Sequence, residues 1–382
     1  MSIDDELLQR EAAEAAASGG TLTIDLDAIA GNYRYLASRT KAGAGASVKA
    51  DGYGLGLVPV VNALASAGCR TFFVASVEEG GALRAALPDA VIYVLNGLFS
   101  GSEKLFVSEN LRPCLSSLEE VREWAAFRKH SKAPAAALHG DTGIHRLGFQ
   151  PTDADEIAAL AQDFKVSLLM SHLACADDPA NPLNAIQRSR FDALRATFPG
   201  IPASLSNTAG VLLDPAFHYD LVRPGIGLYG GNPFDAPGHP FKPVVTLAAR
   251  IMRVITIEPG ESVGYGATFT AARPTRIATI AAGYADGYFR VLSSADGTGL
   301  CVSIAGHRAP IIGRVSMDMI TVDVTDLPPE AVRRGDFAEL IGAQATVNEV
   351  GRAAGTIGYE VLTRLGYRYR RTYTSASGIS SL

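Results

Sequence analysis

The sequence GASVKADGYGLG at residues 45–56 joins a short apolar run to a glycine-rich turn through a single lysine, Lys49. An α/β enzyme presents its catalytic groups in this way, at the carboxyl end of a strand and the start of the following loop. A partly desolvated lysine amine loses its charge more easily than a solvated one and can attack an aldehyde. Because a lysine at a strand end is more often a solvated charge, the motif alone makes Lys49 a candidate for Schiff-base chemistry.

The alternation seen at this motif continues along the chain as far as about Pro243, with short apolar runs separated by segments of helical character. The apolar runs predict eight strands, at residues 46–48, 72–75, 91–95, 112–115, 135–138, 166–171, 203–205 and 220–222. The intervening pattern predicts helices at 58–67, 78–87, 118–128, 154–162 and 185–197. Eight strands with helices between them favour a closed (β/α)8 TIM-type barrel over an open sheet.

A different pattern begins after Pro243. The segment 245–257 is rich in β-branched residues, and closely spaced strand-like runs follow it without long helices. These runs are 276–282, 301–304, 310–315, 320–324 and 337–341; residues 347–354 and their continuation toward Leu365 are expected to be helical, and the serine-rich tail from Thr374 is expected to fray. We therefore predict an α/β chain in three parts: an acidic N-terminal extension (1–20) that forms a short helix, a barrel domain (21–243) and a C-terminal mainly β domain (244–382).

The composition limits the class of protein. The chain has 382 residues, 47% of them apolar, and a net charge of -5, which suits two domains with a large core. No basic stripe indicates a nucleic-acid partner, no apolar run approaches the length of a membrane span, and the acidic N-terminus lacks the features of a secretory signal. The four scattered cysteines show neither metal-ligand nor redox spacing. We expect a cytoplasmic protein without a metal, a nucleic-acid partner or a membrane anchor.

In a TIM barrel the catalytic side chains come from the carboxyl ends of several strands. Those ends carry basic, small polar and glycine residues here, and no pair of carboxylates suited to a metal or to glycoside hydrolysis. The candidates are Lys49 and Tyr53; His139, Asp141 and Arg146; His172; Asn207 and Thr208; and Arg223, Gly225 and Ile226.

The loops 206–210 and 223–227 follow the seventh and eighth predicted strands, where barrels often bind phosphate. A hydroxyl and exposed backbone N–H groups suit an anion, although either loop alone could be an ordinary βα turn. His172 could equally be a buried structural histidine. Arg146 could be a surface charge, or a guanidinium that binds a carboxylate or phenolate oxygen.

Tyrosines flanked by glycine recur in the C-terminal part, in GYGA at 264–267, GYADGY at 283–288 and GYE at 358–360, and GRVSMD occupies 313–318. Taken alone, such tyrosines are more often loop anchors than catalysts.

Together these motifs resemble those of the alanine racemase family, which belongs to the fold-type III pyridoxal phosphate (PLP) enzymes. The resemblance extends from about Thr21 to Tyr373, and five motifs that occur in the family's order make it specific. They are KADGYGLG at 49–56, DTGIHRLG at 141–148, RPGIGLYG at 223–230, GYGA at 264–267 and Met317-Asp318.

The resemblance implies a PLP-dependent interconversion of L-alanine and D-alanine by two acid/base groups. Lys49 would form a Schiff base with PLP and then act as one of them, and Tyr265 from the partner subunit would act as the other. The implied cofactor-binding residues are Lys49, Tyr53, His172, Asn207, Thr208, Arg223, Gly225, Ile226 and Tyr359. The implied substrate-binding residues are Arg146, Met317 and Asp318, with Tyr284 at the access gate. Because Tyr265 and Met317 are expected in trans, a homodimer is part of the expectation.

His139 departs from the family pattern. Two residues before the position of Asp141, many members carry a lysine that becomes carbamylated and orients the arginine at the position of Arg146. Histidine forms no stable carbamate, so we expect Arg146 to be held by another anion, such as chloride, or less firmly.

Three alternatives stay open to different degrees. A racemase of broader specificity, acting on serine or lysine, differs only in pocket shape, and a methylene difference is worth only about 1–3 kcal/mol. Arg223 argues against a PLP decarboxylase of the same barrel type, because enzymes of that kind carry a glutamate opposite the pyridine nitrogen of PLP. A non-catalytic PLP-binding protein is opposed by the β domain with Tyr265. The sequence does not separate D-alanine supply for peptidoglycan from alanine catabolism.

Overall fold

The computed structural model describes residues 13, 17–234, 238–376 and 378–381. The helix predicted within residues 1–20 therefore lies largely outside the described residues. The chain divides into two compact units, one formed by Ala28–Lys242 and the other by Met1–Asp27 together with Pro243–Leu382.

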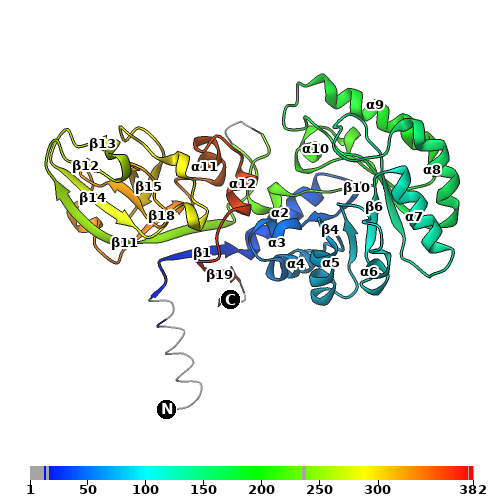
Figure 1. Cartoon of the computed structure of the whole chain (residues 1–382), viewed down its shortest axis with the longest axis horizontal. Helices are drawn as coiled ribbons and strands as arrows, with labels where there is room; N and C mark the ends of the chain where they lie inside the picture. The colour runs from blue at the N-terminus through cyan, green and yellow to red at the C-terminus, as the bar shows by residue number, and fades with distance from the viewer. Residues whose placement is uncertain (1–12, 14–16, 235–237, 377, 382) are drawn as a thin grey trace, which may run out of the picture. The chain divides into compact units, whose positions relative to one another are not determined.

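The unit Ala28–Lys242 is built on parallel strands, each followed by a helical segment on the outside of the barrel (Figure 1). Its strands are β2 (Gly43–Ala44) and β3 (Ala46–Ser47), which together form the first strand, then β4 (Thr71–Val74), β5 (Val91–Val94), β6 (Arg112–Leu115), β7 (Ala136–His139), β8 (Val166–Met170), β9 (Ala203–Ser204) and β10 (Leu221–Val222). Its helices are α2 (Leu26–Ser38, which begins just before the unit), α3 (Lys49–Tyr53), α4 (Leu57–Ser66), α5 (Val77–Ala86), α6 (Glu103–Ser108), α7 (Leu118–Arg128), α8 (Ala154–Leu160), α9 (Pro182–Thr197) and α10 (Thr208–Leu213).

Backbone hydrogen bonds at β10 close this sheet into a barrel. Strands β3 to β9 pair in sequence order, and the Arg223 N–H beyond β10 donates to the Ser206 carbonyl beyond β9 at 2.8 Å. On its other side β10 pairs in parallel with β2, and the Gly45 N–H donates to the Val222 carbonyl at 2.9 Å. The predicted (β/α)8 barrel is thereby confirmed.

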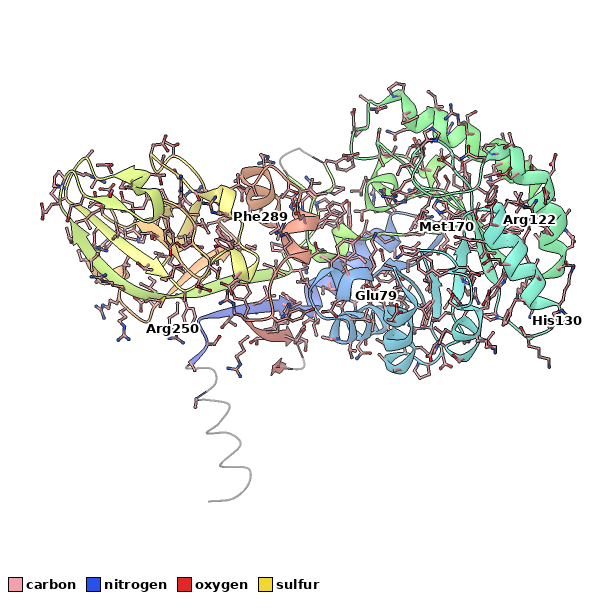
Figure 2. All side chains as sticks on the ribbon, viewed as in Figure 1. Glu79, Arg122, His130, Met170, Arg250 and Phe289 are labelled. Carbon is pink, nitrogen blue, oxygen red and sulfur yellow. The ribbon has the colours of Figure 1, made fainter. Side chains whose placement is uncertain are left out.

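Helix caps explain where the outer helices begin. Ser76 and Ser117 are the N-caps of α5 and α7, and their side chains accept from the backbone N–H of Glu79 and Glu120. Asn181 caps α9 in the same way. The strands between these helices are short and apolar, and they enclose a buried cluster that includes Met170 (Figure 2). Its members are Phe73, Tyr93, Cys114, Ala137, Leu168 and Met170.

The other unit contains a sheet with the path β16-β15-β18-β11-β1-β19-β20, to which β14 and β17 are added through β11. Its strands are β1 (Gly20–Asp25), β11 (Val245–Ile257), β12 (Ser262–Val263), β13 (Phe269–Thr270), β14 (Thr275–Ile280), β15 (Cys301–Ile304), β16 (His307–Pro310), β17 (Ile320–Asp323), β18 (Phe337–Ile341), β19 (Arg370–Ser375) and β20 (Gly378–Ser381), with helices α11 (Val347–Ala353) and α12 (Gly358–Thr363). The predicted mainly β domain is confirmed.

The N-terminal boundary differs from the prediction. Strand β1 pairs antiparallel with β11 and parallel with β19, so residues 21–27 belong with the β unit and not with a barrel domain that starts at residue 21. The partner strands lie more than 200 residues away in sequence, and no local pattern in the first 27 residues identifies them.

The tail also differs from the prediction of a frayed end. Residues 374–375 and 378–381 are paired, because β19 and β20 run antiparallel to each other. Residues 310–315 contribute only the end of β16 and two isolated bridges, where one strand was predicted. Within the described part of the chain, no helix is both long enough and apolar enough to cross a membrane.

Candidate functional site

Lys49 lies at the carboxyl end of β3, at the start of a turn with unusual backbone geometry. Ala50, Asp51, Gly52 and Tyr53 follow with φ angles of 55°, 55°, 62° and 58°, so one turn of left-handed helix comes directly after the lysine. Each non-glycine residue in this conformation costs on the order of 1–2 kcal/mol. Strain of this kind is characteristic of functional sites and persists only where surrounding contacts hold it.

The Lys49 amine has one charged group of each sign in its surroundings, the guanidinium of Arg146 and the carboxylate of Glu79. Partial desolvation, with the nearby guanidinium of Arg146, lowers the pKa of Lys49, and the carboxylate of Glu79 raises it. Lys49 is still exposed to solvent, so a ligand can reach it. An amine with a lowered pKa is a better nucleophile and proton acceptor near neutral pH.

Arg223 is buried at the end of β10 without a carboxylate partner among the described residues. Its guanidinium donates to the Ser204 hydroxyl, to the Ser171 carbonyl at 2.6 Å and to the Leu205 carbonyl at 3.4 Å, and it lies 3.5 Å from Nδ1 of His172. Burial lowers the pKa of Arg223 to about 10, which leaves it charged at neutral pH. Sequence analysis missed Ser171 and Ser204, because only the barrel shows that the carboxyl ends of β8 and β9 lie against Arg223.

Four of the predicted cofactor residues form one cradle. The Thr208 hydroxyl oxygen accepts from the N–H of Gly225 at 2.8 Å and of Gly227 at 3.4 Å. Both acceptor positions are then used, and the hydroxyl can still donate its proton to an additional partner. A Cβ at Gly225 would collide with the Tyr53 hydroxyl, which explains the glycine. Ile226 is the first residue of the 3-10 helix Ile226–Tyr229, so its N–H has no acceptor within that helix.

This cradle suits a phosphate group. Burial raises the pKa of Tyr53, so its hydroxyl keeps its proton and can donate. Its ring stacks on Tyr229 with the centroids 4.4 Å apart, which fixes the hydroxyl in place. Asn207 caps the adjacent helix α10 by accepting from the Gly210 N–H at 2.9 Å. These hydroxyl and backbone N–H donors are groups of the kind that hold an anion such as the phosphate of PLP.

His139 and His172 are both held neutral. Burial, followed by the charges of Arg223 and Arg146, lowers the pKa of His172 well below its usual value. The same three causes lower the pKa of His139 to about 4. Neither ring nitrogen of His139, the last residue of β7, has a hydrogen-bond partner among the described residues. A neutral imidazole cannot replace the negative charge of a carbamylated lysine.

His139 should make stability depend on pH. Its pKa is about 4 in the folded chain and about 6.5 when unfolded, so between these values the unfolded chain binds more protons and stability falls as pH falls. Between pH 7.5 and pH 5, the free energy of unfolding of the wild type should therefore fall by roughly 2 kcal/mol more than that of His139→Gln. Urea unfolding at the two pH values measures this, with His130→Gln, an exposed histidine (Figure 2), as the control. Equal pH dependence in all three proteins would contradict it.

The Asp141 carboxylate organises the turn that presents Arg146. Its Oδ1 accepts from the N–H of Gly143 at 2.8 Å and of Ile144 at 3.1 Å, and its Oδ2 lies 2.8 Å from Nδ1 of His145. Burial opposes ionisation, but these donors keep the pKa of Asp141 below its usual value. The guanidinium of Arg146 is exposed and forms no hydrogen bond or ion pair to another described residue, so its donors can serve a ligand carboxylate.

The β unit carries the other predicted residues on adjacent loops. Tyr265 is 71% exposed and Met317 is 52% exposed. The Tyr284 N–H donates to the Ser316 carbonyl at 3.0 Å, which places Tyr284 against Met317. A Cβ at Gly266 would contact the guanidinium of Arg314, so the Tyr265 turn lies beside the same segment. Apolar side chains gathered at a surface are typical of sites of association.

Asp318 lies in an ion-pair network centred on Arg368. The Arg368 guanidinium contacts Asp318 at 2.7 Å and Asp286 at 2.6 Å, and Asp286 also accepts from the Gly283 N–H at 2.9 Å. The loops that carry Tyr284 and Met317 are thereby joined. Tyr359 lies in the first turn of α12, which is a different segment of the β unit from those that form these ion pairs.

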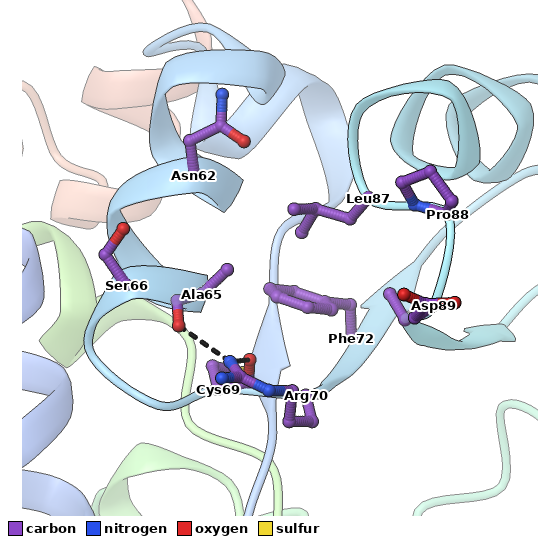
Figure 3. A pocket seen from close by; sticks show the side chains of 10 residues that line it. Asn62, Ala65, Ser66, Cys69, Arg70, Phe72, Leu87, Pro88 and Asp89 are labelled. Carbon is purple, nitrogen blue, oxygen red and sulfur yellow. Dashed lines mark hydrogen bonds between the residues drawn. The ribbon is translucent and has the colours of Figure 1, made fainter.

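A hollow of about 470 Å³ in the barrel unit does not belong to this site (Figure 3). It is lined by the end of α4, by Arg70 and Phe72, and by the loop from Leu87 to Ala90. These segments precede strands, so the hollow lies at the amino end of the barrel, opposite to Lys49. Among the described residues, no group of three or more His, Cys, Asp or Glu side chains is placed to hold a metal ion.

The chain is similar to known proteins over most of its length. The family model "Alanine racemase, N-terminal domain" matches residues 24–233, and "Alanine racemase, C-terminal domain" matches 244–373. An alanine racemase of Methylobacterium sp. (strain 4-46) is 49% identical over 360 residues, covering 93% of this chain and 98% of its own. One of Rhizobium meliloti is 45% identical, covering 95% and 99%. The crystal structure of alanine racemase from Bartonella henselae with covalently bound pyridoxal phosphate is similar at a TM-score of 0.89 and 38% identity, covering 94% and 100%.

Proposed function

The chain belongs to the alanine racemase family, and from this premise we propose that Lys49 and Tyr265 are the two proton carriers of its L-alanine/D-alanine interconversion. The observation that carries the proposal is the Lys49 amine at the carboxyl end of the barrel, with a pKa lowered by desolvation and by Arg146. The enzyme uses PLP. When bound, PLP withdraws electrons from the alanine Cα and makes its proton acidic enough to remove.

We propose that the cradle holds the phosphate of PLP. Tyr53, Thr208 and the backbone of Gly225 and Ile226 supply donors in the barrel unit, with Tyr359 added from the β unit. The Thr208 hydroxyl already accepts from two backbone N–H groups, so its proton is directed to a further acceptor such as a phosphate oxygen. This arrangement supports the assignment.

Arg223, His172 and Asn207 are proposed to surround the cofactor ring. Arg223 is charged and cannot accept a proton, so opposite the ring nitrogen it would donate and leave that nitrogen unprotonated. A ring in this state withdraws electrons less strongly, which limits side reactions such as transamination. The neutral His172 beside Arg223 is consistent with this arrangement, because a second cation there would be repelled.

Racemisation needs carriers on both faces of the alanine Cα, because a single carrier returns the proton to the face it left. Lys49 would serve one face and Tyr265 the other. We propose that Arg146 and the Met317 N–H hold the alanine carboxylate beside Asp318, and that Tyr284 lines the access gate. The exposed guanidinium of Arg146 supports the carboxylate role.

Tyr265 and Met317 are proposed to act in the site of a second copy of the chain. Their exposed side chains support association of the β unit with another surface. A two-fold dimer would create two equivalent composite sites. We place this homodimer in the cytoplasm, and we propose that its product serves either peptidoglycan synthesis or alanine breakdown.

The proposed function is tested by turnover of the purified protein with PLP. Circular dichroism should show L-alanine and D-alanine converging on the same racemic end point. The change should be slower with L-serine, which adds a hydroxyl to the alanine side chain, and with L-lysine, whose additional methylenes each cost about 1–3 kcal/mol in a pocket fitted to alanine. Serine or lysine turned over faster than alanine would replace the proposed substrate. Bound PLP without racemisation of any of the three would refute the two-base proposal.

A further inference from the structure

We propose that Glu79 is a positioning residue. Its carboxylate accepts hydrogen bonds both from the turn that begins at Lys49 and from the neighbouring βα turn, and we call this pair of bonds the clasp. It thereby fixes the position of the Lys49 amine and places a negative charge beside it. This inference rests on the proposed role of Lys49, and it adds a residue that none of the family motifs contains.

The clasp consists of two hydrogen bonds that use both carboxylate oxygens. Oε1 of Glu79 accepts from the Ala50 N–H at 2.7 Å, and Oε2 accepts from the Ala75 N–H at 2.7 Å. Ala50 is the residue after Lys49, and Ala75 is the residue after β4. One side chain therefore ties the ends of two adjacent barrel strands together, through short bonds in which the acceptor is ionised.

The turn after Lys49 needs such support. Four consecutive residues there have left-handed φ angles, and three of them are not glycine. The Asp51 carboxylate helps at the far end of the turn by accepting from the Leu57 N–H at 2.7 Å. Glu79 acts at the near end, next to the reactive amine.

Glu79 is itself fixed in the first turn of α5. Its N–H donates to the Ser76 N-cap hydroxyl at 3.4 Å, and Gly80 follows against the side chain of Leu111 without room for a Cβ. The side-chain cap and the close packing of Gly80 against Leu111 fix the start of the helix from which the carboxylate extends. Glu79 is labelled in Figure 2 on the barrel unit.

The charge of Glu79 also affects Lys49. The groups around the amine are Arg146, Glu79 and the neutral His172; Arg146 lowers the pKa of Lys49 and Glu79 raises it. Loss of the Glu79 charge is therefore expected to lower the pKa of Lys49 further, because an uncompensated cation remains beside it.

The chain contains a matched control in Glu120. The sequences Ser76-Val77-Glu78-Glu79 and Ser117-Leu118-Glu119-Glu120 place the two glutamates at the same position of their helices. Glu120 accepts from the Ser116 N–H at 2.6 Å and also from the backbone of Leu98. It therefore clasps the turns after β5 and β6 as Glu79 clasps those after β3 and β4, but it does not contact the turn of Lys49.

The experiment compares the wild type with Glu79→Gln and Glu120→Gln as full-length proteins. Amide hydrogen exchange of the PLP-bound enzymes reports the backbone around Ala50 and Ala75, and pH-dependent acetylation of Lys49 in the PLP-free proteins, read by mass spectrometry, reports its pKa. The amide of Glu79→Gln keeps only one acceptor oxygen, so we expect exchange to be faster by about tenfold at whichever of Ala50 and Ala75 loses its acceptor. We also expect a lower pKa of Lys49 and a fall in kcat of about ten- to a hundredfold with little change in KM. In Glu120→Gln we expect faster exchange only near Leu98 and Ser116.

Glu79→Asp keeps the charge but shortens the reach, so it should restore much of the Lys49 pKa while exchange near Ala50 or Ala75 stays fast. It also provides the test if Glu79→Gln does not fold. Wild-type exchange and wild-type Lys49 pKa in Glu79→Gln would overturn the inference, as would equal effects of Glu120→Gln on Lys49. Exchange and acetylation do not depend on turnover, so they still test the clasp if Lys49 proves dispensable for racemisation.

Discussion

Lys49→Ala is expected to reduce racemisation by at least about 10³-fold, because the variant loses a proton carrier and the amine that binds the cofactor. Circular dichroism with L-alanine and D-alanine measures the loss in both directions. The absorbance of bound PLP should change at the same time, since the Schiff base to the protein cannot form. Deuterium exchange at the alanine Cα, followed in heavy water, should be lost from the Lys49 face.

Lys41→Ala is the control for Lys49→Ala. Lys41 is also exposed in the barrel unit, a few residues before the first strand, and its removal should leave both turnover and the PLP spectrum unchanged. Full racemisation by Lys49→Ala would show that another amine performs the chemistry and would end the two-base assignment.

Tyr265→Phe is expected to lower racemisation by about 10²–10⁴-fold, the usual contribution of a general acid/base. The substitution removes only the phenolic O–H, so PLP binding and the Lys49 face should persist. The variant should therefore still exchange the Cα proton of one alanine enantiomer with solvent deuterium, while the other enantiomer exchanges slowly. Proton NMR of each enantiomer in heavy water separates the two.

Tyr367→Phe is the matched control for Tyr265→Phe, because Tyr367 is 86% exposed in the same unit and has no proposed role in catalysis. It should racemise at the wild-type rate. Equal loss of exchange from both enantiomers in Tyr265→Phe would contradict a role on one face only.

Mixing the two inactive variants tests whether Tyr265 acts in trans. In a dimer with shared sites, a heterodimer of Lys49→Ala and Tyr265→Phe contains one intact site and one site with both defects. Random association of equal amounts should then restore about a quarter of the wild-type activity. No recovery after co-expression, with heterodimers confirmed by mass spectrometry, would place Lys49 and Tyr265 of one chain in the same site.

The strand and helix pattern was predictable because it is local. Alternating apolar runs predicted all eight barrel strands, and α7 begins and ends at the predicted residues. The tail was predicted wrongly, because a serine-rich composition resembles a loose end until its pairing with β19 is known. Strand β1 was missed as a member of the β unit for the same reason.

The candidate site was partly predictable. Position at a strand end selects Lys49, Arg223 and Thr208 from the sequence, because parallel strands in a barrel bring their carboxyl ends together. The neighbours that hold these groups are not selected in this way. Ser204 supports Arg223, and Glu79 supports the Lys49 turn, yet a serine in a strand and a glutamate in a first helical turn are ordinary features of any sequence.

The sequence by itself determined the family, the barrel, the β unit and the reactive side chains, since motif order and hydrophobic periodicity are properties of the chain alone. Only the tertiary structure decided the charge state and support of those side chains. The pKa of His139 near 4 arises from burial, from Arg223 on another strand end and from Arg146. The lowered pKa of Lys49 arises from burial and from Arg146, which is distant from Lys49 in sequence. Desolvation and charge–charge interaction depend on distance in space, and that distance is set when the strands close into the barrel.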